Sequence, residues 1–140
     1  MMGLGRTHNV LTAASTITIP LVNYGAVEFY SFEADGTTIM TVTELDSTGV
    51  ESEQNLDVDF EPHKCPGVGG SWTAMAEQDN TVDLGGDSTN DMLFIVVHAT
   101  QLSDGYDSVK VTASVGILTA VLIDPAVQRA PANLKSSIVA

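Results

Sequence analysis

Two apolar stretches decide the fold class: Met92-Leu93-Phe94-Ile95-Val96-Val97 and, further along, Ile117-Leu118-Thr119-Ala120-Val121-Leu122-Ile123. Both have the character of strands, and both are apolar on each face. Such a strand has to be covered on both faces, which is typical of a central position in a sheet that packs against another layer. We therefore expect this part of the chain to form the platform of a β protein and to carry no chemistry of its own.

Two other segments follow the period of two that half-buried strands show. Residues 108–115 alternate between apolar and polar side chains, and residues 16–22 alternate until Pro20. Because proline cannot donate a hydrogen bond to a neighbouring strand, Pro20 predicts that its strand lies at a sheet edge or ends there.

The middle of the chain carries a turn signal and an amphipathic pattern. Residues 26–34 and 37–45 have strand-like composition, and the Asp-Gly pair between them predicts a β-hairpin. Residues 56–61 predict a strand with one apolar and one anionic face, and the anionic face must meet water or cations. Its apolar members are Leu56, Val58 and Phe60, and its acidic members are Asp57, Asp59 and Glu61.

The remaining segments define the expected domain boundaries. Residues 62–86 are rich in proline, glycine and polar side chains and predict a long surface loop, with a short strand at residues 82–84. Residues 1–15 and 126–140 show no convincing period and are expected to be extended arms. The prediction is one domain over residues 16–125, an antiparallel β-sandwich of jelly-roll-like form with two terminal arms.

The charge of the chain excludes several classes of partner. Its 18 acidic residues give a formal net charge of −13. Nucleic acid and anionic lipid surfaces are bound by clustered basic side chains, so neither is an expected partner. An acidic, solvated exterior is the simplest interpretation. The five cations are scattered along the chain: Arg6, Lys64, Lys110, Arg129 and Lys135.

Cysteine use and hydropathy limit the class of protein further. Cys65 is the only cysteine, so no disulfide can form within the chain. No apolar run approaches the roughly 20 residues that span a bilayer, and the N-terminal stretch does not have the pattern of an export signal.

The spacing of possible metal ligands does not favour a zinc site. His63 and Cys65 lie close together, and His98 and His8 would have to complete a zinc site, but zinc sites usually show paired ligands. Calcium is the alternative, because carboxylates are frequent in residues 57–61 and 79–91, although the ligand order of an EF-hand is absent. We expect no metal and no other cofactor.

Catalytic motifs are also weak. Cys65 with His63 and the glycines at 67, 69 and 70 match no nucleophile or phosphate-binding motif, so we expect no enzyme activity. A calcium- or carbohydrate-binding module remains an alternative, in which aromatic side chains form a stacking surface for a sugar. The candidates for that surface are Trp72, Tyr24, Tyr30 and Tyr106.

The sequence Asp-Gly-Tyr-Asp-Ser-Val-Lys-Val at residues 104–111, followed by Leu122-Ile123-Asp124-Pro125 and Arg129, resembles small structural proteins of tailed bacteriophages. The family it resembles is the capsid decoration, or cement, proteins. This resemblance implies a small β-rich protein, often trimeric, that binds the outside of an icosahedral shell and holds neighbouring major capsid proteins together. It also implies synthesis in the host cytoplasm and no enzyme activity.

The functional hypothesis is therefore a non-enzymatic virion protein that contacts the capsid through its arms and self-associates as a homotrimer. A phage tail-tube or head-tail connector component is the alternative in the same class. The candidate contact residues are Leu4, Arg6, Val10, Leu11, Trp72, Val127, Arg129, Leu134 and Ile138.

Overall fold

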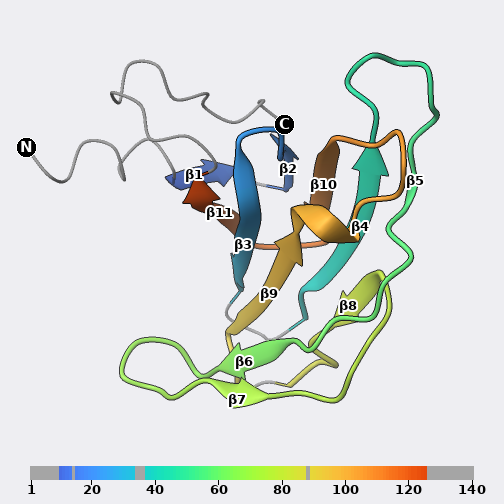
Figure 1. Ribbon diagram of the computed structural model, residues 1–140. Helices are drawn as coiled ribbons and strands as arrows, with labels where there is room; N and C mark the ends of the chain where they lie inside the picture. Colours follow the sequence, from blue (N-terminus) through green and yellow to red (C-terminus); the bar gives the residue numbers. More distant parts are fainter. Residues whose placement is uncertain (1–9, 14, 34–36, 88, 126–140) are drawn as a thin grey trace, which may run out of the picture.

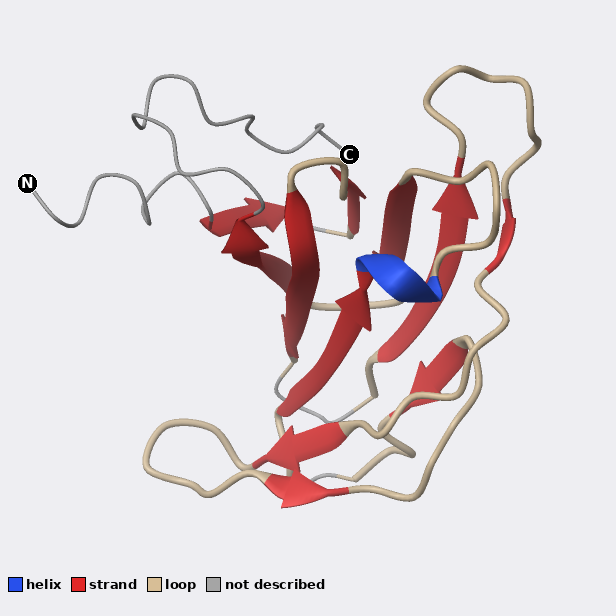
Figure 2. Cartoon of the chain, in the orientation of Figure 1, coloured by secondary structure: helices blue, strands red, loops and turns tan. Residues whose placement is uncertain are grey.

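The chain folds into two antiparallel β-sheets that face each other, with almost no helix (Figures 1 and 2). The computed structural model describes residues 10–13, 15–33, 37–87 and 89–125. The elements are β1 (Val10–Ala13), β2 (Thr16–Pro20), β3 (Tyr24–Phe32), β4 (Ile39–Leu45), β5 (Gln54–Asn55), β6 (His63–Cys65), β7 (Thr73–Ala74), β8 (Thr81–Asp83), β9 (Met92–His98), the 3₁₀ helix η1 (Ala99–Gln101), β10 (Ser108–Ala113) and β11 (Ile117–Pro125).

The strand order is that of a jelly roll. One sheet has the order β1-β11-β3-β9-β6-β7, and the other has the order β2-β10-β4-β5, with β8 also paired to β4. The main strands can be renumbered from one to eight in chain order by leaving out the short strands β5, β6 and β7. The two sheets then have the orders 1-8-3-6 and 2-7-4-5. This is the arrangement of an eight-stranded jelly roll. The predicted all-β sandwich of jelly-roll-like form is confirmed.

The hydrophobic core lies between the inner faces of the two sheets. Phe29, Ile95 and Leu118 from the six-stranded sheet and Ile19 and Val42 from the five-stranded sheet are almost completely buried. Successive side chains of a strand point to opposite faces, so each strand contributes every second residue to this core. Within the described residues, no helix is long and apolar enough to span a membrane.

The central position predicted for the two apolar stretches is confirmed, but their outer faces are only partly covered. β9 lies between β3 and β6, and β11 lies between β1 and β3. Their inner faces are buried, whereas Ile117 is 51% exposed and Phe94 and Val96 are only half-buried. The expectation that both faces are packed is therefore met on one face alone within the described part of the chain.

The hairpin predicted for residues 26–34 and 37–45 is wrong. β3 pairs with β9 and β11, whereas β4 pairs with β10, β5 and β8 in the other sheet. The connection between β3 and β4 crosses from one sheet to the other. The Asp-Gly pair at residues 35–36 lies outside the described residues.

The edge strand and the alternating strand are confirmed. β2 forms an edge of the five-stranded sheet and ends at Pro20, and β10 buries Val109, Val111 and Ala113. The N-terminal arm expected over residues 1–15 contains a paired strand, because β1 runs antiparallel to β11. Residues 1–9 and the C-terminal arm at 126–140 lie outside the described residues.

The segment between β4 and β8 bridges the two sheets. β5 pairs with β4 in one sheet, and β6 pairs with β9 in the other. Residues 56–61, which we call the crossing segment, run between the two sheets. The strand predicted there is wrong, because Phe60 forms only one isolated bridge, with Gln78. The predicted alternation is correct, since Leu56 and Phe60 are buried and the acidic side chains are exposed.

The predicted long loop at residues 62–86 is more ordered than expected. It contains β6, β7 and β8, and the short strand predicted at residues 82–84 is found as β8. The chain between β4 and β9 thus supplies edge partners to both sheets, with β5 and β8 beside β4 and β6 beside β9. This pairing explains why a stretch rich in glycine and proline still forms short strands.

Asp46 organises the turn that follows β4. Its carboxylate accepts hydrogen bonds from the backbone and hydroxyl of Thr48, at 2.8 and 2.7 Å, and from the backbone N–H groups of Val50 and Glu51, both at 3.0 Å. These bonds, led by that from the Thr48 hydroxyl, lower the pKa of Asp46 from 3.8 to about 2. The charged form is therefore favoured in the folded state.

This lowered pKa predicts an acid-dependent contribution to stability. Because the folded pKa of Asp46 is below the unfolded value, its contribution is present above about pH 4 and is lost as the pH falls towards 2. We expect Asp46→Asn to lower the melting temperature at neutral pH, and this difference from the parent protein to shrink between about pH 4 and pH 2. A difference that stays constant over this range would contradict the prediction. Melting curves followed by circular dichroism measure it.

Candidate functional site

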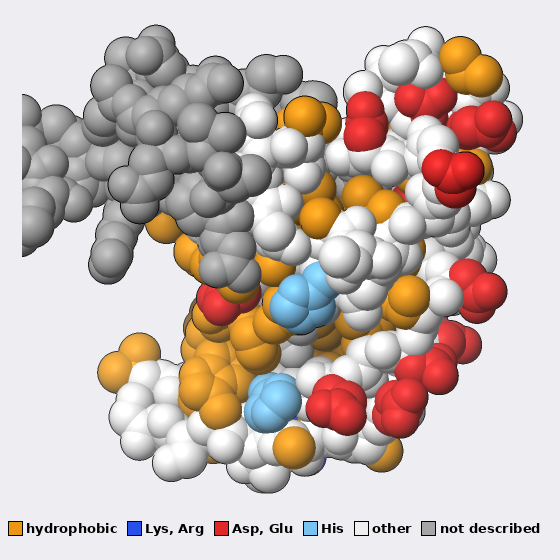
Figure 3. All heavy atoms as spheres, in the orientation of Figure 1, with side chains coloured by type: hydrophobic (Ala, Val, Ile, Leu, Met, Phe, Trp, Pro, Cys, Tyr) orange, Lys and Arg blue, Asp and Glu red, His pale blue; other side chains and the backbone are white. Residues whose placement is uncertain are grey.

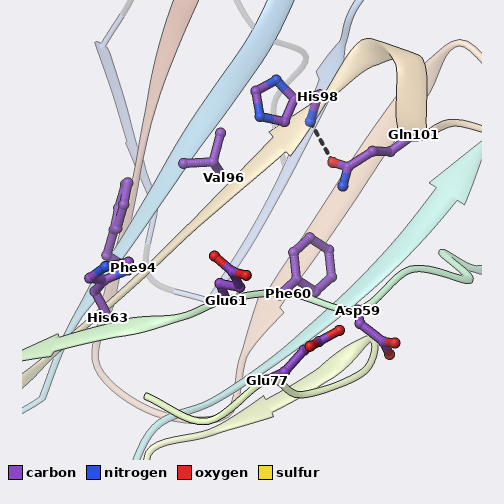
Figure 4. A pocket seen from close by; sticks show the side chains of 9 residues that line it. All are labelled: Asp59, Phe60, Glu61, His63, Glu77, Phe94, Val96, His98 and Gln101. Atoms are coloured by element: carbon purple, nitrogen blue, oxygen red, sulfur yellow. Dashed lines mark hydrogen bonds between the residues drawn. The ribbon is translucent and has the colours of Figure 1, made fainter. Parts of the chain in front are cut away.

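An open cleft of about 370 Å³ lies where the crossing segment passes the edge of β9 (Figure 4). We call it the acidic cleft. It combines three carboxylates with two imidazoles, two phenyl rings and two other side chains. Its lining residues are Asp59, Phe60, Glu61, His63, Glu77, Phe94, Val96, His98 and Gln101.

One wall of the acidic cleft comes from the crossing segment. The backbone of Phe60 exchanges two hydrogen bonds with Gln78, at 2.6 and 3.0 Å, which holds residues 59–61 beside Glu77. Phe60 is buried, and the alternating backbone leaves the acidic side chains on either side of it exposed. The alternation predicted from the sequence therefore places carboxylates at the cleft.

The opposite wall is the last part of β9 with η1. The backbone N–H of His98 donates a 2.7 Å hydrogen bond to Oε1 of Gln101, which fixes the start of η1. β6 pairs with β9 only from Met92 to Phe94, so no described strand covers the edge of β9 between Ile95 and His98. The cleft is thus open along a sheet edge, where backbone groups can pair with an added chain.

An aromatic cluster adjoins the acidic cleft through Phe94, which belongs to both. Its members are Tyr30, His63, Trp72 and Phe94. The ring centroids of Tyr30 and Phe94 are 4.8 Å apart, and Trp72 lies 5.9 Å from Tyr30 and 5.7 Å from Phe94. The His63 ring lies 6.0 Å from Phe94, and its Nδ1 is buried without a hydrogen-bond partner among the described residues.

The aromatic cluster is partly exposed. Trp72 is 42% exposed. The hydroxyl of Tyr30 donates a 2.6 Å hydrogen bond to Oε2 of Glu28. Burial, the hydrogen bond to Glu28 and its negative charge together raise the pKa of Tyr30 to about 12, so the phenol stays neutral. The cluster therefore presents the uncharged rings of Tyr30, Trp72 and Phe94 beside carboxylates.

The carboxylates of the acidic cleft have no cationic partner in the described part of the chain. Lys64 forms an ion pair of 2.8 Å with Asp87, and Lys110 forms one of 3.0 Å with Glu53. Figure 3 shows the surface that contains the acidic cleft: acidic side chains lie along one margin, next to the imidazoles and a continuous hydrophobic area. The site therefore fits a ligand or segment that is both apolar and positively charged.

The structure does not assemble the metal sites that the sequence analysis considered. Among the described residues, no group of three or more His, Cys, Asp or Glu side chains has an arrangement that holds a metal ion. Cys65 is buried and its thiol lies 3.4 Å from the carbonyl of Gly67. The carboxylate of Asp79 accepts the Thr81 N–H at 3.0 Å and so organises a turn. His8 lies outside the described residues.

The predicted contact residues are only partly placed by the structure. Val10 is 49% exposed on β1, Leu11 packs against the core, and Trp72 belongs to the aromatic cluster. The others lie outside the described residues: Leu4, Arg6, Val127, Arg129, Leu134 and Ile138.

Sequence reasoning missed the acidic cleft and a buried carboxylate, Glu44. Only the pairing of β6 with β9 brings His63 to Phe94, and no local pattern signals that register. Glu44 did leave a signal, because the alternation of β4 puts it on the same face as Met40 and Val42. It is completely buried, and it accepts hydrogen bonds from Nε2 of Gln54 at 2.6 Å and from the Ser103 N–H at 2.8 Å.

No protein-family model and no curated protein sequence matches this chain. Among solved structures, the coat protein of Tobacco streak virus in a C2 crystal form aligns at 14% identity over 89% of this chain and 93% of that chain, with a TM-score of 0.14. The Tobacco streak virus coat protein dimer aligns at 14% identity over 89% and 92%, with a TM-score of 0.17. Similarity at this level supports no conclusion, so function has to be argued from the fold and the site.

Proposed function

We propose that this protein is a non-enzymatic structural protein of a virion, a decoration protein that binds the outside of an icosahedral capsid. The observation that carries the proposal is the jelly-roll strand order, an architecture that recurs in viral capsid domains and in lectins. Because one fold serves many functions, this support is an analogy at the level of the fold. The resemblance of residues 104–129 to phage cement proteins points in the same direction.

In this proposal the partner is the major capsid protein, and the terminal segments at residues 1–9 and 126–140 make the contacts. An arm that crosses a subunit boundary buries surface on two partners, and many copies on one shell multiply weak contacts. The protein self-associates, as a homotrimer, after synthesis in the host cytoplasm. The acidic body faces solvent, which suits the exterior of the shell better than its genome-facing side.

Purified virions provide the test. We expect mass spectrometry to detect the protein in them and an antibody against it to label intact particles. Deleting residues 1–9 and 126–140 together should reduce the number of bound copies and the heat resistance of the capsid. Absence from virions would overturn the proposal. Light scattering of the free protein separates a closed trimer from the rings or tubes expected of a tail-tube or connector component.

A second candidate, carbohydrate binding, is favoured by one specific observation. Half-exposed Trp72 stands against Tyr30 and Phe94 beside a cleft lined with carboxylates, which is the combination of ring and hydrogen-bonding groups that sugars use. Binding to immobilised glycans that is lost in Trp72→Ala would support this function. Melting curves with added calcium or a chelator test the calcium-dependent form, which requires a shift.

A further inference from the structure

The outer face of the six-stranded sheet is unusually apolar for a sandwich, whose outward-facing residues are normally polar. The strand registers place side chains from β11, β3 and β9 in rows across this face. Phe32 and Ile117, which share one row with Met92, are 47% and 51% exposed. The next row holds Tyr30 and Phe94 of the aromatic cluster. This face continues into the acidic cleft through Phe94.

A segment that covers this face has to match its chemistry. Residues 126–140 contain no acidic side chain and carry Arg129 and Lys135, and their larger apolar residues are Val127, Leu134, Ile138 and Val139. Together with Arg6, these are the three cations that lie outside residues 10–125. Without them, the formal net charge of −13 becomes −16 for residues 10–125. The C-terminal segment is therefore complementary in charge and hydropathy to the outer face and its cleft.

The C-terminal segment also begins beside this face. Ile123 of β11 lies opposite Ala26 of β3, which lies opposite His98 at the end of β9. Two strand spacings, about 10 Å, separate β11 from β9. A fully extended chain of 15 residues reaches about 50 Å, which is several times that distance. Because the segment is covalently attached, its effective concentration at the face is of the order of millimolar.

We propose that in the free protein residues 126–140 fold back over the outer face of their own six-stranded sheet. Their apolar side chains pack on the aromatic cluster and on Phe32 and Ile117, and Arg129 and Lys135 lie against the carboxylates of the acidic cleft. The proposal concerns the free protein and does not depend on the capsid role. If both hold, capsid binding replaces this intramolecular contact by contacts with the shell.

Trp72 is the only tryptophan of the chain, so its fluorescence reports on the proposed site. We expect a variant ending at Pro125 to show red-shifted emission and stronger quenching by acrylamide than the full-length protein. Every residue of the described core lies between Ile17 and Leu122, so the truncation leaves this core intact, and circular dichroism verifies it. A synthetic peptide of residues 126–140 should restore the emission of the truncated variant.

Charge reversal tests the complementarity in the full-length chain. The double variant Arg129→Glu, Lys135→Glu should show the same red shift as the truncated variant. The peptide with both changes should bind the truncated variant about tenfold or more weakly, which corresponds to ~1.4 kcal/mol. Deleting residues 1–9 is the matched control and should leave Trp72 emission unchanged.

Three outcomes would overturn the inference. Identical Trp72 emission in the full-length and truncated proteins would show that residues 126–140 do not cover the site. A red shift caused by deleting residues 1–9 instead would identify a different segment. Emission of the full-length protein that changes with concentration, together with a change in light scattering, would show that a second copy supplies the segment. None of these measurements uses virions, so they fail or succeed independently of the capsid role.

Discussion

Replacing Phe29 by alanine is expected to lower the free energy of unfolding by about 3–5 kcal/mol, a large part of the 5–15 kcal/mol typical of a domain. Phe29 is completely buried at the centre of β3, between Ile95 of β9 and Ala120 of β11 in the register of the six-stranded sheet. Alanine would leave a cavity in the closely packed space between the sheets. Urea denaturation measures the loss, through the midpoint and slope of the transition.

Phe32 provides the matched control for Phe29. It lies on the same strand, but on the outer face, and is 47% exposed. We expect Phe32→Ala to cost about 1 kcal/mol, because only part of the side chain is removed from water. Equal losses for the two variants would contradict the assignment of an inner and an outer face to β3.

The alternation of apolar and polar residues predicted which side chains are buried more reliably than it predicted strand partners. For residues 56–61 the pattern placed Leu56 and Phe60 inside and the acidic side chains outside, as found, although no strand forms there. Burial follows from the local sequence, because any extended backbone turns successive side chains to opposite sides. Pairing depends on where distant segments lie.

The hairpin error has the same cause. The turn signal at residues 35–36 favours a change of direction, but a tight hairpin and a connection between two sheets both require one. β10 occupies the place beside β4 that β3 would fill in a hairpin. The hairpin and the connection between sheets differ in their contacts with residues far along the chain. A pattern over a few residues carries no information about such contacts.

The acidic cleft illustrates how much of a site depends on such contacts. The sequence correctly predicted one feature of each wall: exposed carboxylates on the crossing segment and an apolar strand at β9. The register of β6 against β9 then brings His63 to Phe94, and the crossing segment brings Glu61 opposite Val96 (Figure 4). A surface that is both anionic and aromatic results from this assembly.

Glu44 places a buried carboxylate among the apolar side chains on the inner face of β4. It links the end of β4 to β5 through Gln54 and to the loop after η1 through Ser103. Removal of this acceptor would leave two donors, the Ser103 N–H and the Gln54 amide, without their partner. The hydrogen bond from Ser103 also attaches the loop after η1, which lies next to one wall of the acidic cleft, to the five-stranded sheet.

We expect Glu44→Ala to lower the free energy of unfolding by about 1–3 kcal/mol, because the Ser103 N–H and the Gln54 amide lose their acceptor. Glu53→Ala is the matched control: Glu53 lies nearby and accepts hydrogen bonds from Thr43 and Lys110, but its side chain is 39% exposed. An exposed pair of this kind contributes about 0–1 kcal/mol. Urea denaturation of both variants compares the losses. If Glu53→Ala cost as much as Glu44→Ala, burial would not be the reason for the effect, and the link through Ser103 would have no special role in holding η1 at the cleft.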